Sequence, residues 1–243
     1  MIRHAIKILL ISAGLFAAVL AVSARADHLP PGVKIIHVRQ PSYMQKVPGQ
    51  STYTKENLDA AEELAKIGDA EAQSNLGVML ASNGNYKEAA FWYKKAALSG
   101  ISTAMYNLGV LYFNGQGVDK SYSEAHRWFA HAAERGNPYA QLQLGLMSLT
   151  GQGLPKDKEQ EFYWYRKAAM QGLPAAAYNL AVMYHNGDGT KQDEVRAYAW
   201  MLLAGKGGID TSSALPIIAQ GMSSDDIAKA QSLSRRLLGD PVP

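Results

Sequence analysis

The sequence contains no cysteine, which excludes disulfide bonds and any chemistry that needs a thiolate. It also has no marked excess of charge of either sign. Of its 24 basic residues, Arg3, Lys7 and Arg25 lie in the first 26 positions, and the other basic residues equal the 21 acidic ones in number. Beyond those positions the net charge is zero, so the chain has no bulk electrostatic attraction for nucleic acid. No nucleic-acid partner is therefore predicted.

Motifs of known catalytic machinery are missing as well. Gly205-Lys206 is followed by Gly207 and lacks the earlier glycine of a phosphate-binding loop. The sequence has neither a nucleophile elbow nor a zinc-protease H-E-x-x-H, and the motif set of serine β-lactamases is absent. His126 and His131 are about 140° apart around a helix, so they are not placed to bind one metal ion together. The sequence predicts no enzyme, no cofactor and no metal site.

Only one long hydrophobic run is present, at residues 8–22, and Ala24-Arg25-Ala26 follows it. The run is 15 residues long, shorter than the roughly 20 residues of a membrane-spanning helix, which favours a cleaved signal peptide over an anchor. We predict that residues 1–26 are a signal peptide cut after Ala26. The mature protein is then expected to be periplasmic or secreted, without membrane insertion. Because no cysteine follows, lipoprotein processing is excluded.

A repeated pattern occupies most of the remaining chain. Four stretches that begin at Ala72, Ala104, Ala140 and Ala176 share the same arrangement of apolar residues, and their starts are 32, 36 and 36 residues apart. A period in this range is typical of solenoids, in which one supersecondary unit stacks on copies of itself. We refer to these stretches as copies 1 to 4.

Copy 2 indicates two helices within residues 104–136. An apolar stripe at helical spacing is interrupted by Gly115-x-Gly117, and a second apolar stripe follows. Gly136 stands where a C-cap glycine belongs. Gly109, opposite small alanines of the second stripe, is predicted to let the two helices approach closely. Neither helix can bury its stripe alone, so the copies are expected to stack.

These motifs resemble the Sel1-like repeat family, which is related to the tetratricopeptide repeats. Its leucine–glycine and tyrosine positions recur at Leu108-Gly109 and Tyr112, and its W-Y-x-K-A-A segment recurs at 92–97 and 164–169. The departures from the family pattern are Ala181 for the glycine, Leu80 and Ser148 for the tyrosine, and a short loop in copy 1. The resemblance implies an all-α fold, a right-handed α-solenoid of antiparallel helix pairs.

The predicted domain layout follows from the repeats. Residues 27–53 contain four prolines and no helical periodicity, so they are predicted to be an extended or disordered arm, with 34–38 as a candidate strand. The arm serves either as a tether or as a partner-binding segment. Ser223, with Asp226 three residues later, is the predicted N-cap of the last helix. The solenoid is expected at 54–237, as a half-repeat cap 54–68, repeats 69–100, 101–136, 137–172 and 173–208, and a C-terminal cap 211–237 with a break or short helix at 211–221.

The first helix of each copy is apolar also on the side opposite the second helix. A helix that is apolar on both sides must be covered on both sides. Neighbouring copies are expected to cover part of this second stripe, and the remainder is predicted to line a concave groove for a peptide or helix of a partner protein. The stripe is strong in copies 2 to 4 and fades in copy 1. The candidate partner-binding residues on it are Tyr106, Val110, Phe113, Leu142, Leu146, Leu149 and Tyr178.

An amide side chain recurs beside this stripe, at Asn75, Asn107, Gln143 and Asn179. These amides either bind the backbone of an extended ligand or satisfy carbonyl groups between helices. We include Asn107, Gln143 and Asn179 among the candidate partner-binding residues.

Three classes of function are compatible with the sequence. Sel1-like proteins commonly act as adaptors, so the resemblance implies an exported scaffold or regulator that binds another protein or peptide. Some periplasmic relatives hold the sensory domain of a histidine kinase silent, which makes a regulator of a sensor kinase one form of this hypothesis. The second class is a structural component of envelope or secretion machinery. The third is an enzyme acting on β-lactams or cell-wall fragments, which no motif here supports.

Overall fold

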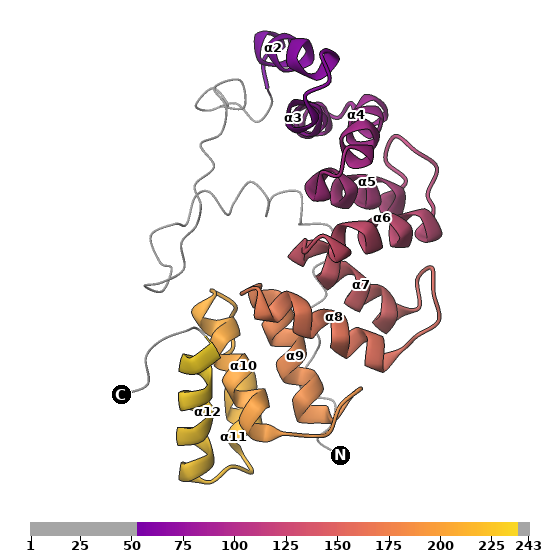
Figure 1. Ribbon diagram of the computed structural model, residues 1–243. Helices are drawn as coiled ribbons and strands as arrows, with labels where there is room; N and C mark the ends of the chain where they lie inside the picture. The colour runs from indigo at the N-terminus through magenta and orange to yellow at the C-terminus, as the bar shows by residue number, and fades with distance from the viewer. Residues whose placement is uncertain (1–52, 238–243) are drawn as a thin grey trace. The chain divides into compact units, whose positions relative to one another are not determined.

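The computed structural model describes residues 53–237. The predicted signal peptide, the candidate strand at 34–38 and the predicted arm up to residue 52 lie outside the described residues. Within the described range every regular element is an α-helix (Figure 1). The helices are α2 (Lys55–Lys66), α3 (Ala70–Ser82), α4 (Tyr86–Leu98), α5 (Ser102–Asn114), α6 (Tyr122–Glu134), α7 (Pro138–Thr150), α8 (Lys158–Met170), α9 (Pro174–Asn186), α10 (Glu194–Lys206), α11 (Ala214–Ala219) and α12 (Ser224–Leu237).

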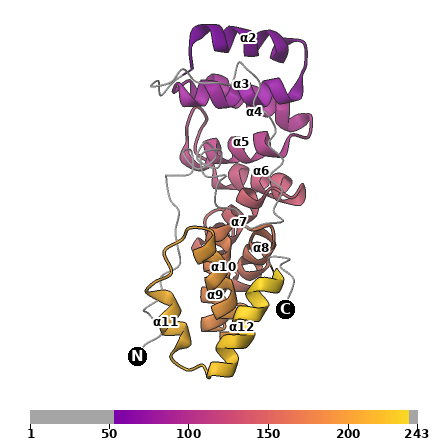
Figure 2. The same ribbon diagram turned by 90° about the vertical axis from the view of Figure 1, so that its left-hand side faces the viewer.

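The described chain forms two compact units, residues 53–155 and residues 156–237. In the N-terminal unit each helix from α2 to α7 packs on the next one along the chain. In the C-terminal unit α8 packs on α9 and α9 on α10, while α12 lies alongside α10 (Figures 1 and 2). The fold is therefore all-α and built of consecutive helix pairs, which confirms the predicted fold class.

Short polar side chains start most of the helices. The side chain of Asp69 accepts a hydrogen bond from the amide of Ala72 at 2.7 Å, and Ser121, Asn137, Asp157 and Asp193 cap α6, α7, α8 and α10 in the same way. Such a bond satisfies one of the amides that a helix start leaves without a partner. The capping box predicted for the last helix is confirmed. The Asp226 amide donates to the Ser223 hydroxyl at 3.2 Å, and the Asp226 carboxylate accepts from the Ser223 amide at 3.4 Å.

A glycine in the middle of α5 permits the close approach of α6, as the sequence predicts. A Cβ atom on Gly109 would lie 2.7 Å from the Phe129 ring and 3.3 Å from the backbone oxygen of Ala125. Gly77 faces the Tyr93 ring in the same manner, at 2.6 Å. An aromatic ring on the second helix thus occupies the volume that the missing side chain leaves. In copy 4 both members of the pair change, since Ala181 replaces the glycine and the flexible Met201 stands at the aromatic position.

The second glycine of each Gly-x-Gly loop touches the preceding copy. A Cβ atom on Gly153 would lie 2.7 Å from the backbone oxygen of Tyr122, at the start of α6. Gly117 likewise meets the backbone of Tyr86 at the start of α4, and Gly189 meets that of Lys158 at the start of α8. All three glycines have positive φ angles, between 64° and 80°. These positions therefore need glycine both for their backbone conformation and for the space.

The short loop of copy 1 makes its contact with the preceding helix differently. It lacks the Gly-x-Gly triplet, and the side chain of Asn83 contacts the backbone of Tyr53 instead. The Asn83 amide oxygen accepts a hydrogen bond from the Tyr53 amide at 3.0 Å, and its amide nitrogen donates to the Tyr53 carbonyl at 3.1 Å. Two side-chain hydrogen bonds thus hold the residue just before the Thr54 N-cap of α2.

Candidate functional site

Burial divides the candidate partner-binding residues into two groups. Tyr106, Leu142, Leu146 and Asn179 are buried, so they offer almost no surface to a partner in this conformation. The half-buried residues, which keep part of their surface exposed, are Val110, Phe113, Leu149, Tyr178, Asn107 and Gln143.

Tyr106 is buried between the second helix of its own copy, α6, and the first helix of the next copy, α7. Its ring lies 5.7 Å from that of Phe129 and 6.0 Å from that of Tyr139, at the start of α7. Burial raises the pKa of Tyr106, while the Gln143 side chain beside its hydroxyl acts in the opposite direction. Tyr106 is only 4% exposed and Leu142 2%, and this side of the stripe packs one copy on the next.

Half-buried aromatic side chains gather where the loops of copies 2 and 3 meet. The Phe113 ring lies edge-on to the Tyr122 ring at 5.1 Å. The Lys120 amine lies 4.8 Å from the centre of the Tyr122 ring, and Gln152 donates to the Tyr122 hydroxyl at 3.3 Å. Phe113 is therefore held in place by neighbours and keeps part of its ring accessible, as a preorganised contact residue does.

The recurring amides lie against tyrosine hydroxyls inside the protein. Asn107 on α5 hydrogen-bonds to the Tyr93 hydroxyl on α4. In the C-terminal unit the Asn179 side chain lies in the same way beside the Tyr165 hydroxyl and lowers its pKa against the larger effect of burial. Copy 2 has Phe129 at the tyrosine position, and there the amide, Gln143, lies at Tyr106 instead.

A different pair of amides satisfies carbonyl groups between helices. Gln73 donates to the carbonyl of Ala65 and Gln141 donates to that of Ala133, each at 3.1 Å. Both glutamines follow the leading alanine of their copy, and neither is among the residues predicted from the sequence. Their signal was a polar residue at a position where the other copies have methionine or alanine.

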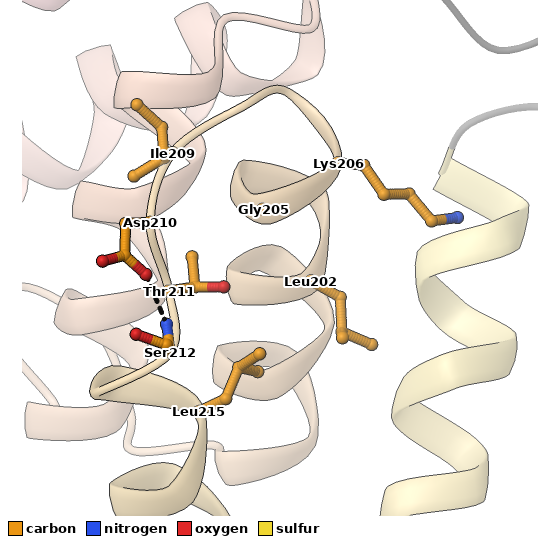
Figure 3. A pocket seen from close by; sticks show the side chains of 8 residues that line it. All are labelled: Leu202, Gly205, Lys206, Ile209, Asp210, Thr211, Ser212 and Leu215. Atoms are coloured by element: carbon orange, nitrogen blue, oxygen red, sulfur yellow. Dashed lines mark hydrogen bonds between the residues drawn. The ribbon is translucent and has the colours of Figure 1, made fainter. Parts of the chain in front are cut away.

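The C-terminal unit has a pocket of about 540 Å³ at the junction between copy 4 and the C-terminal cap (Figure 3). Its walls include Leu202, Ile209 and Leu215. Burial raises the pKa of Tyr178, and the charge of Asp210, which lines the pocket, acts in the same direction. The polar groups diverge, because Lys206 extends toward α12 while Asp210 accepts a hydrogen bond from the Ser212 amide at 3.0 Å. This arrangement has no pair of groups aimed at a common reacting atom.

The C-terminal unit also buries one carboxyl group outside the pocket. Glu161 is 2% exposed, and burial, together with the charge of Asp188, raises its pKa to about 7, against the opposite influence of Lys158. The Lys158 amine and the Asp188 carboxylate form an ion pair beside it. Across residues 53–237 no group of three or more histidine, aspartate or glutamate side chains is placed to hold a metal ion.

Large apolar side chains also lie exposed on the outer faces of the second helices. Phe91 and Leu98 on α4 are 54% and 74% exposed, and Tyr163 and Met170 occupy the equivalent positions of α8. Basic side chains are exposed on the same helices, among them Lys94, Lys95, Arg166 and Lys167. None of the helices in the described part of the chain is both long and apolar enough to cross a membrane.

Comparison with known proteins identifies the repeat. The Sel1 repeat profile matches residues 70–101, 102–137, 138–173 and 174–209. No curated protein matches the sequence.

Solved structures similar to this chain include two Sel1-type repeat proteins. One is the crystal structure of a protective antigen present in uropathogenic Escherichia coli strains, which displays an SLR fold, with a TM-score of 0.68 and 32% identity over 76% of this chain. The match covers 41% of that antigen, so this chain spans about two fifths of its length. The other is a Sel1 repeat protein from Oxalobacter formigenes, with a TM-score of 0.61 and 25% identity over 77% of this chain and 80% of that one.

Proposed function

Because this chain belongs to the Sel1 repeat family, whose members generally mediate protein–protein interaction, we propose that it is an exported module that binds a partner protein. The partner docks on the exposed parts of the second apolar stripe, on α5 and α7 of the N-terminal unit. A regulatory partner, such as the extracytoplasmic domain of a sensor kinase, is the form of this function that we favour.

One observation carries the proposal. Val110, Phe113 and Leu149 remain half-buried although the opposite sides of their helices are packed. Rigid apolar side chains with accessible surface suit a binding site, because they add contact area at little cost in conformational entropy. Asn107 and Gln143, which are half-buried as well, are the polar members of the candidate set in this unit.

Export is the first part of the proposal to be tested. The mature protein isolated from the cell envelope or the medium is expected to begin at Asp27, because Ala24-Arg25-Ala26 supplies the small residues of a cleavage site. Intact-mass measurement together with N-terminal sequencing checks this. A mature protein that retains Met1 would contradict export by a cleaved signal.

The partner site is tested with two double variants of contrasting burial. A partner is first cross-linked to the protein in envelope extract, identified and purified. Val110→Ser with Leu149→Ser is expected to weaken its binding by about tenfold or more with little change in melting temperature, since both residues are partly exposed already. Calorimetric titration measures the binding, and circular dichroism measures the melting temperature.

Tyr106→Ala with Leu142→Ala is the matched control. Both side chains are buried, so their loss is expected to destabilise the N-terminal unit by about 2–5 kcal/mol for each residue. Full binding by the Val110/Leu149 variant would place the partner site elsewhere, and residues 27–53 would be the next segment to test.

A further inference from the structure

The exposed apolar residues of the N-terminal unit lie on the outer faces of two helices. On α4, Phe91 and Leu98 are seven residues apart and therefore on the same side of the helix. At the end of α2, Leu64 is 39% exposed and Ile67 80%. Apolar side chains scattered singly over a surface are ordinary, but these form two short stripes, each within one helix face.

The two stripes have flanking charges of opposite sign. Lys94 and Lys95 lie between Phe91 and Leu98, and the Lys95 amine is 4.6 Å from the centre of the Phe91 ring and 4.9 Å from that of Trp92. No ion pair within the described residues involves Lys94 or Lys95. The charge beside the α4 stripe is therefore positive and not neutralised by neighbouring acids.

Acidic side chains predominate beside the α2 stripe. They are Glu56, Asp59, Glu62 and Glu63, and the exposed charges of the other sign on that helix are Lys55 and Lys66. Lys66 already pairs with Glu62 at 2.9 Å. On α4 the exposed acid is Glu88, near the start of the helix and away from Lys94 and Lys95.

The repeat register places these charges at equivalent positions. Leu64, Ala65 and Gly68 align with Ala96, Ala97 and Gly100, so Glu62 and Glu63 correspond to Lys94 and Lys95. Equivalent positions of successive repeats face the same side of a stack, and α2 and α4 both pack on α3. One side of the N-terminal unit thus carries an acidic apolar helix and a basic apolar helix.

We propose that this side is a self-association surface, on which the acidic α2 of one copy of the chain lies against the basic α4 of a second copy. In a dimer with two-fold symmetry this contact forms twice, because α2 of each copy lies against α4 of the other. Only two short apolar stripes supply the contact, so we expect a weak dimer with a dissociation constant on the order of micromolar. An anionic membrane surface fits less well, since the acids of α2 would be repelled by the same headgroups that attract α4.

This inference concerns a surface distinct from the proposed partner site and stands independently of it. Sedimentation velocity of the purified protein is expected to show a monomer–dimer equilibrium that weakens as salt is added. Lys94→Glu with Lys95→Glu is expected to raise the dimer dissociation constant about tenfold or more, and Glu62→Lys with Glu63→Lys likewise. Combining the two pairs restores opposite charges across the contact and is expected to recover most of the wild-type association.

Arg166→Glu with Lys167→Glu is the matched control. It makes the same change in net charge at the equivalent positions of α8, and it is expected to leave dimerisation unchanged. Leu98→Ser with Ile67→Ser removes two exposed anchors and is expected to weaken the dimer without lowering the melting temperature. A protein that stays monomeric at several hundred micromolar overturns the proposal. So does a charge-swapped combination that associates no better than either pair alone.

Discussion

Replacing Glu161 with alanine is expected to stabilise the protein, and the gain should be largest above pH 7. In copies 1, 2 and 4 the position of Glu161 is held by a fully buried alanine, at Ala89, Ala125 and Ala197. Glu161 is just as inaccessible, and its Oε1 atom has no hydrogen-bond partner within the described residues. A buried carboxylate without full hydrogen bonding is costly, and this cost is what raises its pKa to about 7.

The direction of the pH dependence follows from the two pKa values. In the unfolded chain the carboxyl group ionises near 4.5, whereas in the folded protein it ionises near 7. The folded state therefore binds the proton more tightly, and the Glu161 contribution to stability falls as pH rises from about 4.5 through 7. Below that window the group is neutral in both states and its ionisation has no effect.

The expected difference between Glu161→Ala and the wild type is about 1–3 kcal/mol near pH 8.5, and smaller near pH 5. Thermal melts at both pH values, followed by circular dichroism, measure it. Glu161→Gln keeps the size of the side chain and cannot ionise, so it should show the same loss of pH dependence. A difference from the wild type that does not vary with pH would show that the Glu161 carboxyl group ionises at the same pH in the folded and the unfolded protein.

Gly117→Ala is expected to cause a large loss of stability. The new Cβ atom would overlap the backbone of Tyr86 and Lys87, so the loop after α5 must move away from α4. Adding the strain of a non-glycine residue at φ 69° gives a cost of about 2–5 kcal/mol. Urea denaturation of the purified variant and the wild type provides the measurement.

Gly136→Ala separates the two causes of this loss. Gly136 also has a positive φ, of 82°, but its Cβ atom would have no neighbour within 4 Å. Its substitution should therefore cost only the backbone strain, about 1–2 kcal/mol. If the two variants lost the same amount of stability, the contact between the loop and α4 would contribute nothing.

The helix pairs of this protein were predictable because their determinants are local and repeated. Apolar spacing, turn glycines and N-cap residues act within a few positions of one another, and four copies make each signal easier to recognise. The Ser223–Asp226 capping box and the close approach at Gly109 are confirmed for this reason. Gly117 contacts the start of α4 in the preceding copy, and Asn83 contacts Tyr53 just before α2. Contacts of this kind between successive helix pairs cannot be predicted from the sequence of one copy.

Burial within the second stripe was harder to predict. Helical geometry predicts that Tyr106 lies on the side of α5 that faces away from the second helix. Whether that side is buried depends on the angle between successive copies, which the sequence of one copy does not determine. Tyr139 of the next copy lies against Tyr106, and no local pattern connects the two residues. The exposure of Phe91 and Leu98 was not predicted for a related reason. The sequence of a helix does not show whether another element packs on a given apolar residue.

The contact between each Gly-x-Gly loop and the second helix of the preceding copy also affects how such a chain gains or loses copies in evolution. Gly117, Gly153 and Gly189 each meet the backbone at the start of the second helix one copy earlier, so the contact requires no particular side chain there. A duplication or deletion of a 36-residue copy would re-create that contact at the new joint without any compensating substitution. Copy 1 differs, because Asn83 holds Tyr53 through two side-chain hydrogen bonds. For this contact the inner copies are therefore equivalent, whereas copy 1 is matched to the N-terminal cap that precedes it.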